Sequence, residues 1–283
     1  MSSSPSFASD DLPEPPDLSQ HFGRMATDRH LKVGKALAEE LGIDLGHSVL
    51  ELGCGTGLLS SHLAQRVGMQ GDVLGLDPSP YHITVAHQRA RPQLRFQVGS
   101  PDTLGRFPNG CFDVVIAHDL VATWPDVEAV LRTLWRVLRP GGRLGLSAWD
   151  DASPHPAEVV RKAVLAQAPF SVHPVPAPSQ RHPVLAESLF EAAQAAGCEH
   201  IRVIREPEPV THSTASAAWA YLEACHWGED LKHLPTQPDD LREQAKQAIL
   251  RGLERLRTRH GWRHQGARLM LVASKSSLPR RGA

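Results

Sequence analysis

The chain has 283 residues, 41% of them hydrophobic, and its 30 Lys and Arg residues nearly balance its 31 Asp and Glu residues, which gives a net charge of -1. No stretch approaches the ~18 consecutive apolar residues that cross a bilayer, and the first residues lack the basic and apolar segments of a secretion signal. We therefore expect a globular cytoplasmic protein without a membrane span. The balanced charge argues against nucleic-acid binding through a broad basic surface.

Cysteine and histidine do not occur with the spacing of a metal site. The four cysteines lie far apart and form no C-x-x-C pair, and none of the 16 histidines belongs to an H-E-x-x-H motif. The sequence therefore predicts no metal ion and no disulfide framework, and we expect the cysteines to be mostly buried thiols.

The N-terminal region divides into a tail and a helix. Residues 1–17 are rich in Ser, Asp and Pro and cannot bury enough apolar surface to offset the entropy of ordering, so we expect a flexible tail. Residues 18–41 have a helical pattern, with an apolar stripe in its second half, and Gly42 is suited to end the helix. Residues 18–45 are thus expected to form a helical cap that closes over a bound ligand.

The next segment is an apolar strand that ends in three glycines at alternate positions, Gly53, Gly55 and Gly57. Because glycine has no Cβ, a chain that turns from a strand into a helix can bring its backbone N–H groups close to a ligand there. A second strand-like run ends in Asp77, roughly 20 residues further on, where dinucleotide-binding folds place the carboxylate that accepts from ribose hydroxyls. The G-x-G-x-G spacing differs from the G-x-G-x-x-G dinucleotide fingerprint, and the pattern predicts a nucleotide-sized cofactor.

Strand-like and helix-like segments alternate from residue 46 to 148, which favours a doubly wound parallel sheet with helices on both faces. The Pro and Gly residues of 139–142 predict a sharp turn before the last of these strands. The expected strands are 49–52, 73–76, 94–98, 114–117 and 143–148, and the expected helices are 58–66, 80–89 and 127–138.

We expect the rest of the chain to form a lid-like insertion and the end of the sheet. Seven prolines between residues 149 and 183 flank a short helical run at 157–168, which predicts a lid-like insertion. Residues 184–275 are expected to complete the sheet around a helical insertion, with helices at 185–196, 214–224 and 239–259 and strands at 201–204 and 268–273. Residues 276–283 are expected to be a second flexible tail.

Four motifs in this order resemble the class I S-adenosylmethionine-dependent methyltransferases, and most closely the group with the type 11 and ubiquinone methyltransferases. The motifs lie at residues 51–57, 75–79, 111–115 and 138–144. The resemblance implies a Rossmann-like α/β fold with a seven-stranded, mostly parallel sheet whose last strand is antiparallel. It also implies S-adenosylmethionine as cofactor and a small-molecule acceptor.

Carried over by position, the resemblance implies a set of cofactor-binding residues around the carboxyl ends of the strands. Relatives often have an acidic residue where Ser100 stands, so Asp102 is a possible substitute. His118, after the fourth strand, has two open interpretations: a general base near the methyl group, or a residue that packs on the cofactor through its backbone. The neighbouring Asp119 has a weaker claim. The cofactor set is Glu51, Gly53, Cys54, Gly55, Gly57, Asp77, Pro78, Ser100, Asp102 and His118.

The sequence thus favours methyl transfer to a small molecule and leaves two alternatives. One is a non-catalytic protein or sensor that binds S-adenosylmethionine. The other is a nucleotide-dependent oxidoreductase, although neither tyrosine is followed by Lys at the fourth position. The acceptor, its reacting atom and the oligomeric state are not encoded in any recognisable motif.

Overall fold

The computed structural model describes residues 24–153, 160, 183–212, 214–224, 239–259 and 261–277. Its centre is a seven-stranded sheet with the order β3-β2-β1-β4-β5-β7-β6. The strands are β1 (Ser48–Leu52), β2 (Asp72–Asp77), β3 (Leu94–Val98), β4 (Phe112–His118), β5 (Leu138–Trp149), β6 (Arg202–His212) and β7 (Trp262–Ser274).

The strand directions confirm the predicted topology. Strands β1 to β5 pair in parallel, whereas β7 runs antiparallel to both β5 and β6. The strand order reverses between β1 and β4, which are neighbours although two strands separate them in sequence. In open α/β sheets, ligands bind outside the carboxyl ends of the strands at this reversal.

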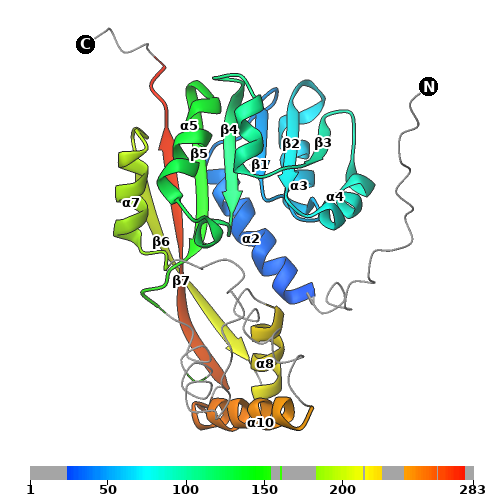
Figure 1. The fold of residues 1–283 in the computed structure, drawn as a ribbon, viewed down its shortest axis with the longest axis vertical. Helices are drawn as coiled ribbons and strands as arrows, with labels where there is room; N and C mark the ends of the chain where they lie inside the picture. The colour runs from blue at the N-terminus through cyan, green and yellow to red at the C-terminus, as the bar shows by residue number, and fades with distance from the viewer. Residues whose placement is uncertain are drawn as a thin grey trace, which may run out of the picture.

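Helices cover both faces of the sheet (Figure 1). One face packs against α2 (Arg24–Glu40), α3 (Leu58–Val67) and α4 (Pro80–Ala86), and the other against α5 (Val127–Val137) and α7 (Ala186–Ala195). Because side chains alternate along a strand, Val114 and Ile116 of β4 join the first layer, while Val115 and Ala117 join the second. Burial of both faces explains why these strands have continuous apolar runs.

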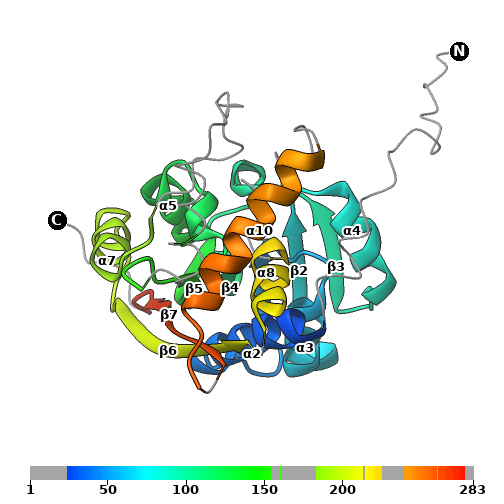
Figure 2. The same ribbon diagram turned by 90° about the horizontal axis from the view of Figure 1, so that it is seen from below.

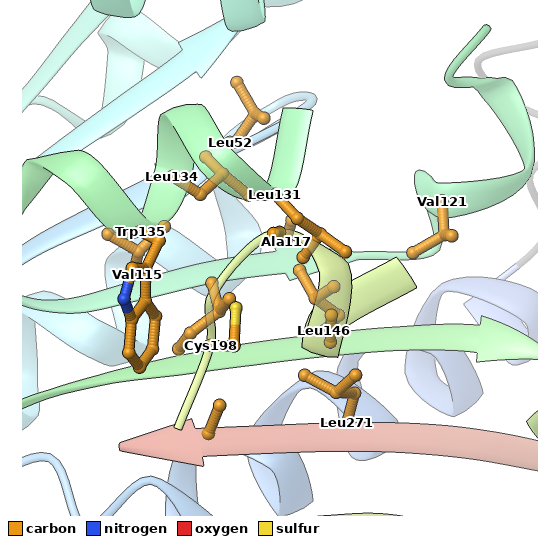
Figure 3. Close-up of a cluster of buried hydrophobic side chains, with 14 of the residues drawn as sticks. Leu52, Val115, Ala117, Val121, Leu131, Leu134, Trp135, Leu146, Cys198 and Leu271 are labelled. Carbon is orange, nitrogen blue, oxygen red and sulfur yellow. The ribbon is translucent and has the colours of Figure 1, made fainter. Parts of the chain in front are cut away.

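The layer between the sheet and α5 is a closely packed apolar cluster (Figure 3). Leu131 and Leu134 of α5 lie over Ala117 and Val115 of β4, and Leu146 and Leu271 extend the cluster to β5 and β7. The cluster joins the parallel half of the sheet to the antiparallel strand and so fixes where the carboxyl ends of β1 and β4 lie.

The prediction of a sharp turn at 139–142, with the next strand starting only at residue 143, was wrong. Strand β5 begins at Leu138, and these residues form an irregularity within it: the pairing with β4 jumps from Phe112↔Leu138 to Val114↔Arg143. Gly141 has φ +78, a left-handed conformation that lets the extra residues bulge without breaking the strand. Lys275, the residue after β7, stabilises the bulge: Gly141 N–H donates to the Lys275 carbonyl (2.9 Å), and Lys275 N–H donates to the Gly142 carbonyl (2.9 Å).

The two late strands are longer than the sequence predicts, and they extend beyond the sheet. Their antiparallel pairing continues from Arg202↔Val272 to His212↔Trp262, which carries the hairpin to a small helical lobe. This lobe contains α8 (Ala215–Ala224) and α10 (Asp239–Arg255), packed around Trp219, Ile249, Leu253 and Trp262. Figures 1 and 2 place the lobe across the carboxyl edge of the parallel strands.

Several predicted segments lie outside the described residues. These are the tail at 1–17, the first part of the N-terminal cap, all but residue 160 of the helical run at 157–168, and most of the tail at 276–283. The lid-like role of 149–183 therefore stays a prediction. In the described part of the chain, no helix has both the length and the apolar character needed to cross a bilayer.

Candidate functional site

The glycine loop after β1 adopts the backbone that its sequence predicts. Gly53, Gly55 and Gly57 have φ of +76, +51 and +80, the left-handed region in which other residues are strained. A Cβ on Gly53 would lie 2.2 Å from Leu120 Cδ1, so this glycine lets the loop after β4 pack closely against the end of β1. A Cβ on Gly55 would meet nothing within 4 Å, which leaves open space beside that part of the loop.

Asp77 lies at the carboxyl end of β2 and ties the glycine loop to the neighbouring strand. Its carboxylate accepts from Gly55 N–H (2.9 Å) and from Ser79 N–H (2.9 Å), and it lies 3.0 Å from His82 Nδ1. Burial acts to raise the pKa of this carboxyl, but the hydrogen bonds from His82, Ser79 and Gly55 outweigh it and hold the pKa below its ordinary value. Asp77 is therefore ionised at neutral pH, and its two oxygens have further acceptor capacity.

A cavity of about 370 Å³ opens beside this loop. It brings together four residues from the predicted cofactor set: Gly53, Pro78, Ser100 and Asp102. They come from the ends of β1, β2 and β3, so segments far apart in sequence meet where the strand order reverses. Leu52 and Pro101 adjoin these residues, and the rest of the wall comes from the segment after β4 and the start of α5: Leu120, Thr123, Trp124, Pro125, Asp126, Ala129 and Val130.

Cys54 and Glu51 lie behind the glycine loop and do not line this cavity. Cys54 is buried against β2, and a Cβ on Gly75 would lie 2.9 Å from Cys54 Cβ. Glu51 is buried in β1 and accepts a hydrogen bond from Ser60 Oγ. Burial raises the pKa of the Glu51 carboxyl to about 8, although the Ser60 hydrogen bond acts in the opposite direction. Both residues therefore support the loop from within the core.

We expect Glu51→Gln to stabilise the folded protein more at alkaline pH than at acid pH. The unfolded carboxyl has a pKa near 4.5, so the raised pKa near 8 in the folded state means that stability falls as the pH rises from the first value through the second. Gln keeps an oxygen that accepts from Ser60 and has no proton to lose. Calorimetry should show that the Tm of Glu51→Gln minus that of wild type is larger at pH 9 than at pH 5. The exposed Glu40→Gln serves as control, and a Tm difference independent of pH would contradict the assignment.

His118 is placed at the end of β4 but has no free nitrogen for proton transfer. Its Nε2 lies 2.8 Å from the His30 carbonyl, which can only accept, so this nitrogen carries the proton. Its Nδ1 then accepts from Ser147 Oγ. Burial lowers the pKa of the His118 imidazole to about 3, because the charged form loses its hydration. This geometry argues against the general base, which is one of the two interpretations that the sequence left open for His118.

A largely but not fully buried network of charges begins at the residue after His118. Asp119 pairs with the guanidinium of Arg268 from β7, and Arg268 also pairs with Glu208 from β6. The guanidinium carbon lies 5.0 Å from the centre of the Trp149 ring. Although burial acts to raise the pKa of the Asp119 carboxyl, Arg268 holds that pKa well below its ordinary range. Arg268 could have been suspected from sequence as a charge at the start of an apolar strand, but its partners could not.

The side chains of His30, His118 and Asp119 lie close enough to hold a metal ion, since their ligand atoms fall within 4.8 Å of one another. Each potential ligand of His118 and Asp119 is already used: His118 bonds His30 and Ser147, and Asp119 pairs with Arg268 and His30. A cation here would have to displace Arg268 from Asp119. The arrangement therefore suits an internal hydrogen-bonded network better than a metal centre.

The sheet topology and the site at its reversal define a class I methyltransferase fold, and comparisons with known proteins agree. Residues 49–142 match the family model described as a methyltransferase domain. The chain is 40% identical over 98 residues to trans-aconitate 2-methyltransferase of Deinococcus radiodurans, covering 35% of this chain and 36% of the relative. It is 31% identical over 187 residues to nocamycin O-methyltransferase of Saccharothrix syringae, covering 61% of this chain and 66% of the relative.

A solved structure extends the likeness beyond the matched domain. Phosphoethanolamine N-methyltransferase 2 of Haemonchus contortus, in complex with S-adenosylmethionine, superposes with a TM-score of 0.54 at 16% identity, covering 92% of this chain and 58% of that one. These comparisons show that residues 49–142 form a methyltransferase domain and that the fold is that of the class I methyltransferases. The chain spans about a third to two thirds of the two curated relatives described above.

Proposed function

We propose that the chain is an enzyme that transfers a methyl group from S-adenosylmethionine to a small-molecule acceptor. The observation that carries the proposal is the 370 Å³ cavity at the reversal of the strand order, which is lined by Gly53 of the glycine loop and by Pro78, the residue after the ionised Asp77. The relatives described above act on small molecules according to their names, which supports the same class of acceptor.

The residues present fit this cofactor. Asp77 is an ionised carboxylate with acceptor capacity left for ribose hydroxyls, and the space beside Gly55 leaves room for a ligand against the loop. Ser100 and Asp102 line the cavity together with Pro78, where an adenine ring would be enclosed. The cofactor supplies an activated methyl group on a sulfonium, so the chain needs only to bind and align the reactants and remove a proton where the acceptor carries one.

The lobe of α8 and α10 supports an enclosed acceptor. It lies across the carboxyl edge of the strands and is joined to the sheet by the continuous β6–β7 hairpin, so its position is set by strand pairing (Figures 1 and 2). A lobe in this position would cover one side of an acceptor bound at the carboxyl edge. A cytoplasmic location and the absence of a nucleic-acid partner remain predictions from the sequence.

Binding and transfer can be tested separately. We expect calorimetry to give a micromolar or tighter Kd for S-adenosylmethionine and S-adenosylhomocysteine and no binding of NAD. Tritium from the labelled methyl group should then pass to at least one of a set of small acids, phenols, enols and amines. Binding without transfer to any of them would support a sensor, and binding of NAD alone would support the oxidoreductase alternative.

A further inference from the structure

His30, on the N-terminal helix α2, lies at the carboxyl edge of the sheet beside the residue that follows β4. Its Nδ1 lies 3.2 Å from Asp119 Oδ2, and its side chain is 53% exposed. Its ring packs on that of His118, with 3.8 Å between ring centroids. No sequence pattern singles out His30, because Asp119 lies 89 residues away.

Asp119 is held in a conformation that aims its carboxylate at His30. It has φ +59, one of two left-handed non-glycine residues in the described part of the chain, and its N–H donates to the Ser147 carbonyl (3.0 Å). Arg268 takes the other carboxylate oxygen. Unusual backbone of this kind persists where the surrounding structure determines it, often at functional sites. The carboxylate is thus fixed by its backbone and by a buried cation.

The pairing with Asp119 sets the tautomer of His30. An ionised carboxylate only accepts hydrogen bonds, so the proton of neutral His30 lies on Nδ1. Nε2 then has a lone pair that no group in the described part of the chain uses. The helix is held in place as well, because His118 Nε2–H donates to the backbone carbonyl of His30. The charged and titratable groups around His30 are His118 and Asp119 at the end of β4 and, behind Asp119, Arg268 of β7 and Glu208 of β6.

We propose that His30 is the general base of the methyl transfer, that Asp119 and His118 position it, and that the acceptor is a weakly acidic hydroxyl, a phenol or an enol. This inference rests on the proposed function. In the step, the hydroxyl proton passes to His30 Nε2 while the acceptor oxygen bonds to the methyl carbon. The bond from that carbon to the cofactor sulfur breaks, which yields the methyl ether and S-adenosylhomocysteine. Carboxylates carry no proton at neutral pH that must be removed, so they would not need this base.

The test compares His30→Asn with wild type, since the Asn amide can still donate to Asp119 but cannot accept the hydroxyl proton. The acceptor is caffeic acid, whose phenol hydroxyls keep their protons at neutral pH, with trans-aconitate as the acceptor that needs no base. We expect kcat for a hydroxyl acceptor to fall about 100-fold or more, the KM for S-adenosylmethionine to stay within about threefold, and the acid limb of the kcat–pH profile to disappear. Asp119→Asn should lower kcat by a smaller factor and displace that limb. His47→Asn, partly exposed at the opposite edge of the sheet, should leave all three readouts unchanged.

A measurement without an acceptor keeps the proposal falsifiable. Histidine ¹⁵N spectra of the complex with S-adenosylhomocysteine should show His30 protonated at Nδ1, and Asp119→Asn should abolish that preference. Protonation at Nε2 would overturn the proposal, as would His30→Asn with wild-type kcat on a hydroxyl. Turnover of only trans-aconitate, or of no acceptor at all by protein that binds S-adenosylmethionine, would overturn the acceptor class. Failure to bind S-adenosylmethionine would instead refute the proposed function.

Discussion

Replacing Asp77 with Ala is expected to weaken S-adenosylhomocysteine binding by about 10- to 100-fold. A hydrogen bond to a charged acceptor contributes about 1.5–3 kcal/mol, and each 1.4 kcal/mol is a factor of ten in Kd. The change also frees Gly55 N–H from its partner and so loosens the loop that faces the ligand. Isothermal titration calorimetry measures the effect, and circular dichroism checks that the variant is folded.

The control for this change is Asp72→Ala on the same strand. Asp72 lies at the opposite end of β2 and pairs with Arg95 on the surface, so its loss should leave Kd within about twofold. The 2′-deoxy analogue of S-adenosylhomocysteine sharpens the test. If Asp77 binds the ribose, wild type should discriminate between the two ligands and Asp77→Ala should not. Equal discrimination by both proteins would show that the carboxylate acts on the loop alone.

Replacing Arg268 with Ala is expected to lower the free energy of unfolding by about 3–5 kcal/mol. The change leaves Asp119 and Glu208 without the cation that they share, and removing one member of a buried charge network costs about this much. It also removes the cation packed against the Trp149 ring. Urea denaturation followed by fluorescence gives the difference directly.

Two comparisons separate the effect of burial from the effect of charge: an exposed ion pair outside the network, and a variant in which the whole network is neutral. Arg95→Ala breaks an exposed pair with Asp72 and should cost less than about 1 kcal/mol. Adding Asp119→Asn and Glu208→Gln to Arg268→Ala should recover part of the loss, because the buried negative charges are removed as well. If Arg268→Ala costs no more than Arg95→Ala, the network is hydrated in solution and the expected large effect is wrong.

The parallel half of the fold was predictable because its signals are local. An apolar run is followed by residues of special backbone or charge in two places: the glycines come after β1 and Asp77 comes at the end of β2. The observed strands lie within two residues of the predicted ones up to β4. The bulge at 139–142 shows the limit. Pro and Gly indicate that the chain departs from regular structure, but only the contact with Lys275 decides that the strand continues.

The candidate site was predictable only for residues that directly follow a predicted strand. Gly53, Pro78, Ser100 and Asp102 do line one cavity, as their positions after successive strands indicate. The network of His30, Asp119 and Arg268 draws its members from α2, the loop after β4 and β7. No spacing along the chain encodes such a meeting, because packing of distant elements creates it. His118 was identified for its position, but its burial, which sequence did not reveal, leaves it no nitrogen free.

The place of β7 between β5 and β6 has a consequence for how the chain folds. β5 ends at residue 149 and its partner begins at residue 262, so the sheet cannot be completed until more than a hundred further residues have been synthesised. Until then the edge of β5 exposes unpaired N–H and C=O groups beside the apolar side chains of Leu144 and Leu146. The nascent chain should therefore be prone to aggregation at this edge and should depend on chaperones in the interval before Ser274 leaves the ribosome.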